Sequence, residues 1–109
     1  SIENIYTTGS RIYSKSFSLI WNTEDDNPKI KLLIVVPKKK IKQAVNRNYI
    51  KRIIRESYVI NKNVIYDMIS NPIKVILVYN KSSLPKFDEL KAELLTLFKC
   101  LEKEINEIT

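Results

Sequence analysis

The segment from Ile30 to Val36 is almost continuously apolar and rich in β-branched residues. A run of this length is far shorter than a membrane span and is typical of a central strand covered on both faces. A second such run extends from Ile73 to Tyr79. Between the two, residues 43–58 have the apolar spacing of an amphipathic helix, whose apolar side would cover the sheet. Strand, helix and strand in this order predict a mixed fold with a buried sheet.

The remaining segments predict a small two-layer α+β sandwich. They are the end of a helix at residues 2–6, a short and a longer strand within residues 11–21, a loop at residues 61–71 and a final helix from residue 87 onward. One more turn is expected within that loop, around residues 64–69. The expected order is αβββαβα, with a four-stranded sheet and helices on one face. A chain of 109 residues fits one core, so we expect a single domain over residues 1–109. The first residue is Ser1 and not Met, which indicates a trimmed N-terminus.

The chain contains no His and one Cys, Cys100. It therefore cannot form a Ser-His-Asp triad or a Cys/His zinc site, and it has no imidazole to act as a base near neutral pH. One Cys cannot form an intramolecular disulfide, which together with the lack of a secretion leader favours a cytoplasmic location. We expect no catalytic residue, no metal site and no cofactor in the protein itself.

The charge of the chain is concentrated in one segment. The formal net charge is +7, and residues 29–62 carry eleven basic side chains and one acidic side chain. A protein surface usually mixes charges of both signs, because a field of one sign repels itself. The segregation predicts a polyanionic partner, which could be a nucleic acid, an anionic membrane surface or an acidic protein.

Arginine is concentrated in the expected helix. Three of the four arginines of the chain are Arg47, Arg52 and Arg55. A guanidinium is a planar set of donors that matches phosphate geometry and stacks on bases. A helical projection places Asn48 and Lys51 on the same side as these arginines. The opposite side, which we expect to pack on the sheet, carries Tyr49, Ile50, Ile53 and Ile54.

Two other interpretations of this helix are weaker. The arginines could form ion pairs on an ordinary exposed helix, but Glu56 is the only acidic residue near them in the sequence. A basic amphipathic helix can also lie on a membrane. Here the apolar side is needed to cover the sheet, so a nucleic acid is the favoured partner.

Residues 44–56, Ala-Val-Asn-Arg-Asn-Tyr-Ile-Lys-Arg-Ile-Ile-Arg-Glu, closely resemble the signature of the protein component of bacterial ribonuclease P. In that signature an Ala-Val pair precedes an Arg-Asn-basic run, followed by Lys-Arg and Arg-Glu. The resemblance covers nearly the whole chain and includes Gly9, the strand led by Phe17 and the final helix. Two positions depart from the pattern: Lys42 replaces a usual Gly, and Tyr49 replaces a usual basic residue.

The resemblance implies an αβββαβα fold in which the signature helix joins two parallel strands by a left-handed crossover. It also implies a protein subunit that assists a catalytic RNA in removing the 5′ leader of precursor tRNA. The chemistry would then belong to the RNA and its bound Mg²⁺, and the protein alone would be inactive. Its partners would be the catalytic RNA and precursor tRNA, with no membrane and no further protein required.

Two sets of site residues follow from the resemblance. Contacts to the catalytic RNA are implied for Lys38, Lys39, Lys40, Arg47, Asn48, Lys51, Arg52 and Arg55. The single-stranded leader would lie on aromatic side chains in a cleft between the first helix and the sheet, at the positions of Ile2, Tyr6 and Ile20. Only Tyr6 is aromatic here, so a packing role in the core is an open alternative for the two isoleucines.

Another class of function fits the same basic helix. A general structured-RNA binding module, such as a ribosome-associated protein, would use this surface without a leader site. An autonomous nuclease is disfavoured, because the sequence lacks a set of catalytic side chains. A preference for precursor over mature tRNA would separate the first two possibilities.

Overall fold

The structure is a computed structural model that describes residues 10–23, 30–68 and 72–108. The strands in these ranges are β1 (Ser10–Tyr13), β2 (Phe17–Thr23), β3 (Ile30–Val35) and β4 (Ile73–Tyr79), and the helices are α2 (Ala44–Ile60), α3 (Lys62–Met68) and α4 (Phe87–Ile108). The predicted α+β class is confirmed, with α3 as an addition to the expected order. The helix end expected at residues 2–6 lies outside the described residues.

The four strands form one sheet in the order β1-β2-β4-β3. β2 pairs antiparallel with both β1 and β4, whereas β3 and β4 are parallel. The prediction of a central strand at Ile30–Val36 is wrong, because β3 lies at an edge of the sheet and β4 lies inside it. An apolar run indicates how far a strand is covered, but it does not identify the neighbouring strands.

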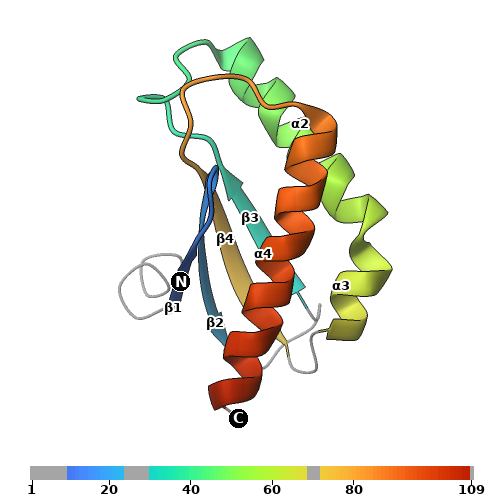
Figure 1. The fold of residues 1–109 in the computed structure, drawn as a ribbon. Coiled ribbons are helices and arrows are strands. Elements are labelled where there is room, and N and C mark those ends of the chain that lie inside the picture. The colour runs from blue at the N-terminus through green and yellow to red at the C-terminus, as the bar shows by residue number, and fades with distance from the viewer. Residues whose placement is uncertain (1–9, 24–29, 69–71, 109) are drawn as a thin grey trace.

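Parallel neighbours require a crossover, and α2 and α3 form the one between β3 and β4. The left-handed sense of this crossover stays a prediction from the resemblance. The three helices of the described residues lie on the same side of the sheet, as Figure 1 shows. The expectation that helices cover one face is therefore confirmed.

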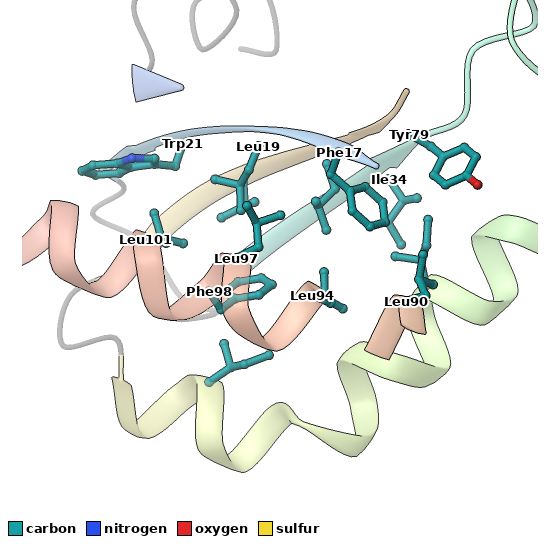
Figure 2. Close-up of a cluster of buried hydrophobic side chains, with 14 of the residues drawn as sticks. Phe17, Leu19, Trp21, Ile34, Tyr79, Leu90, Leu94, Leu97, Phe98 and Leu101 are labelled. Atoms are coloured by element: carbon teal, nitrogen blue, oxygen red, sulfur yellow. The ribbon is translucent and has the colours of Figure 1, made fainter. Parts of the chain in front are cut away.

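The core lies between the sheet and the helices. Phe17, Leu19 and Trp21 alternate along β2 and belong to the same buried cluster as Leu97, Phe98 and Leu101 of α4. Figure 2 shows Leu19 above Leu97, with Trp21 at the end of the strand near Leu101. All six side chains are at most 3% exposed. The apolar side chains of α4 recur at helical spacing, which explains why its burial was predictable from the sequence.

A hydrogen-bonded turn joins β1 to β2 and is attached to α4. The amide of Ser14 donates to the carbonyl oxygen of Phe17 at 2.9 Å. The Glu93 carboxylate on α4 accepts hydrogen bonds from the Ser14 hydroxyl at 2.6 Å and from the Ser16 amide at 2.7 Å. One side chain of α4 thus fixes the end of the β1–β2 hairpin.

The loop expected at residues 61–71, with one turn around residues 64–69, is corrected in part, since α3 occupies residues 62–68. Asn61 separates α2 from α3, and its side-chain amide donates to the carbonyl oxygen of Ser57 at 3.1 Å. Ile65 is fully buried and attaches α3 to the main core. A helix of seven residues is too short to give a clear periodic pattern, so the sequence indicated only a turn there.

Candidate RNA-binding surface

The apolar side of α2 fixes the direction of its basic side. Ile50, Ile53 and Ile54 are buried in the main core. The ring of Tyr58 also packs against the ring of Phe98 on α4, with the centroids 6.0 Å apart. These contacts set the rotation of α2 about its axis. The predicted contact residues that consequently lie fully on the exposed side are Asn48, Arg52 and Arg55.

Arg52 lies near the middle of this exposed side. Its side chain is 68% exposed, and its Nε atom lies 4.0 Å from the Glu56 carboxylate. The guanidinium also lies 5.5 Å from the centroid of the Tyr49 ring. Tyr49 was expected to pack on the sheet, but it is 40% exposed and borders the arginine surface instead. Exposed ion pairs contribute little stability, so Arg52 is available to exchange Glu56 for a phosphate.

Arg47 has different surroundings from the other two arginines of α2. Its Nη1 atom donates hydrogen bonds to the carbonyl oxygens of Ile41 at 2.9 Å and of Lys42 at 2.8 Å. The side chain is half-buried, as is Lys51 one turn further along. The structure therefore places Arg47 at the border of the exposed side, where it holds the chain segment that precedes α2.

The three lysines before that segment form a turn. The amides of Lys40 and Ile41 both donate to the carbonyl oxygen of Pro37, at 3.1 and 3.0 Å. Ile41 is buried and anchors the end of the turn, whereas Lys38 and Lys39 are exposed, as is Lys40. The structure thus brings the lysine turn next to the start of α2 (Figure 1).

The side of the sheet that points away from the helices is a second surface, which we call the outer face. Its centre contains Ile20 and Ile76, which pack with Val35 and Val78 in a small cluster separate from the main core. Ile20 is 1% exposed, so it packs in this structure and offers no surface for stacking. The other two predicted leader residues, Ile2 and Tyr6, lie outside the described residues.

A cavity of about 560 Å³ lies where the β1–β2 turn meets the start of α4. Its lining includes Lys15, Lys81 and Lys86, which lie outside the basic segment 29–62. Tyr79 also lines it, and its hydroxyl donates to the carbonyl oxygen of Ser83 at 2.7 Å. Burial raises the pKa of Tyr79, and the charge of Glu93 raises it further.

The described ranges show no group of three or more His, Cys, Asp or Glu side chains that could hold a metal ion. Within the same ranges, no helix has the length and apolar character needed to span a membrane.

Comparisons with known proteins identify the family to which the chain belongs. Residues 1–102 match the family described as Ribonuclease P. A ribonuclease P protein component from Syntrophus aciditrophicus is 37% identical over 106 residues, which cover 96% of this chain and 82% of that protein. A second protein component, from Chlorobaculum tepidum, is 26% identical and covers 93% of this chain and 75% of its own length.

Two solved structures share the fold. The ribonuclease P protein of Staphylococcus aureus superposes with a TM-score of 0.76 at 24% identity, covering 92% of this chain and 87% of that one. The protein from Thermotoga maritima gives a TM-score of 0.76 at 23% identity, covering 91% and 89%. Together with the family match over most of its length, these similarities show that the chain belongs to the family of ribonuclease P protein components.

Proposed function

We infer that the chain is the protein subunit of a cytoplasmic ribonuclease P and assists the removal of the 5′ leader from precursor tRNA. In this proposal the catalytic RNA and its bound Mg²⁺ perform the cleavage. The protein contributes two surfaces: one binds the catalytic RNA, and the other binds the leader. Membership of the family and the separate positions of these surfaces support the proposal.

The surface for the catalytic RNA is the exposed side of α2 together with the lysine turn. The observation that carries the proposal is that Asn48, Arg52 and Arg55 are all exposed on this side, with Lys38–Lys40 beside the start of the helix. Guanidinium groups bind phosphate oxygens in pairs, and lysines add point charges along the backbone. In this arrangement Lys51 contributes from the border of the surface. Arg47 contributes mainly by holding the segment that joins the turn to the helix.

The leader surface is assigned to the outer face of the sheet. It lies on the opposite side of the sheet from the helices, so one protein can contact the catalytic RNA and the leader at the same time (Figure 1). Ile20 forms part of the packed base of this surface, and Ile2 and Tyr6 complete the set implied by the resemblance. Single-stranded RNA binds to sheet surfaces through base stacking and contacts to phosphates.

The proposal predicts how α2 variants change binding to the ribonuclease P RNA of the same genome. Arg52→Ala and Arg55→Ala should each weaken binding. Each should also reduce the slope of log affinity against log salt by about 0.7 to 0.9, the value for one lost phosphate contact. Lys99→Ala is a matched control, because Lys99 is an exposed cation on α4 outside this surface. Filter binding over a range of salt concentrations measures both quantities.

Two results would contradict the proposal. If affinity and salt slope are the same for both arginine variants as for Lys99→Ala, the exposed side of α2 is not the RNA-binding surface. If the assembled particle binds mature tRNA as tightly as precursor tRNA, the general structured-RNA binding module is the better description.

A further inference from the structure

Tyr13 is an exposed aromatic residue on the outer face. Strand register aligns it with Ser18 of β2, which in turn aligns with Val78 and Val35. Val78 and Val35 belong to the small cluster around Ile20, whereas Tyr13 at the other end of this row is 67% exposed. The ring therefore lies on the same face as the leader position Ile20, but at a point that is open to solvent.

The charged side chains at outward positions of the described strands are all basic. Arg11 precedes Tyr13 by two residues on β1, and Lys31 and Lys74 are register partners on β3 and β4. Glu and Asp do not occur at these outward positions. Of these cations Arg11 is near Tyr13, whereas Lys31 and Lys74 lie further along the same face. A sheet face with an accessible ring and cations has the properties that bind single-stranded nucleic acid without strong sequence preference.

We propose that Tyr13 stacks on a base of the single-stranded 5′ leader and extends the leader-binding surface onto the edge strand β1. This inference rests on the proposed function of the outer face. Two of the three positions that the resemblance assigns to leader binding carry isoleucine, which has no ring to stack on a base. Ile20 is also buried. Tyr13 is the diagonal neighbour of Ile20 across β1 and β2, a relation that places Cα atoms about 7 to 8 Å apart. Its ring therefore lies within reach of the same RNA strand.

The position of the ring also explains how the backbone of the leader would be held. The cation of Arg11 lies on the same strand and face, and the exposed Lys15 follows in the β1–β2 turn. A base stacked on Tyr13 would bring an adjacent phosphate near the Arg11 cation on the same face. Stacking of this kind accepts every base, so the contact favours the presence of a leader over any one leader sequence.

The test measures how tightly tRNA binds to the particle assembled from this protein and ribonuclease P RNA. The substrates are precursor tRNAs with leaders of increasing length and mature tRNA. Tyr13→Ala should lower affinity for long-leader precursors by about five-fold to one-hundred-fold, and it should leave mature tRNA unchanged. Tyr13→Phe keeps the ring and should bind like the unaltered protein. Val64→Ala removes an exposed apolar side chain (50%) from α3, on the opposite side of the sheet from the outer face, and should have no effect.

The outcomes separate this inference from the proposed function. If the unaltered particle gains no affinity from a leader, the proposed leader surface is wrong. If leader dependence is present but Tyr13→Ala retains all of it, the role of Tyr13 is wrong and the proposed function stands. An equal loss for mature tRNA, or an equal loss in Tyr13→Phe, would also overturn stacking by Tyr13.

Discussion

Arg47 and Arg55 are the same residue type about two turns apart on α2, yet they have different surroundings. Arg47 donates to two backbone carbonyl oxygens of the preceding segment, whereas Arg55 is exposed. A helical projection could not separate them, because it records the direction of a side chain and not the position of a loop beside it. The sequence correctly placed Asn48, Arg52 and Arg55 on the exposed side, whereas the half-buried position of Arg47 required the structure.

This difference predicts that two alanine variants differ in their free energy of unfolding. Arg47→Ala should lower the free energy of unfolding by about 1 to 3 kcal/mol, because hydrogen bonds from a charged donor are lost. Arg55→Ala should change it by less than about 0.5 kcal/mol, as expected for an exposed position. Urea unfolding measures both values. Equal stability of the two variants would show that the contacts of Arg47 with Ile41 and Lys42 do not stabilise the fold.

Two tyrosines show the limits of the pattern at single positions. Tyr49 falls at the edge of the apolar side in projection, and the structure leaves it exposed beside Arg52. Tyr13 lies on a strand too short to reveal which of its sides is covered. Its exposure became clear only from the register with β2. In both cases the environment depends on a neighbouring element and not on local spacing.

Among the elements, α2 and α4 were the most predictable. The helix expected at residues 43–58 is observed as α2 at Ala44–Ile60, and the helix expected from residue 87 onward is α4 at Phe87–Ile108. Both have long amphipathic patterns, which give a reliable signal. The position of β3 at the sheet edge was not predictable. An apolar strand can be covered by a helix layer and a small outer cluster without having a strand on each side.

The contact between α2 and α4 predicts a loss of stability at alkaline pH. Burial raises the pKa of Tyr58 well above its ordinary value of 10.0, and its interaction with Tyr66 adds to this. The folded protein thus binds this proton more tightly than the unfolded chain does. The stability that Tyr58 contributes through this difference is complete below about pH 10 and decreases as the pH rises above that value. Tyr58→Phe should lose less unfolding free energy than the unaltered protein between neutral pH and about pH 11 in urea titrations. An identical loss in both proteins would exclude this group as the cause.

At the scale of the whole molecule, the fold places the basic side of α2 and the outer face on opposite sides of one sheet. The helices cover one side, and α2 presents its arginines outward from that layer (Figure 1). The other side carries the outer face with Tyr13. The net charge of +7 is therefore not spread evenly, because the segment 29–62 supplies the lysine turn and the basic side of α2. Charge distribution along the sequence indicated a polyanionic partner, and the fold adds the separation of the two surfaces that we propose bind RNA.

The most direct test of the central claim is cleavage of precursor tRNA at low Mg²⁺ by ribonuclease P RNA of the same genome, measured with and without this protein. Neutralisation of RNA phosphates by the basic surface should replace part of the Mg²⁺ that the RNA needs for folding and substrate binding. We expect cleavage at the 5′ end of the mature tRNA to increase when protein and RNA are combined, and we expect none with the protein alone. Cleavage by the protein without RNA, or no increase in the combined assay, would contradict the account.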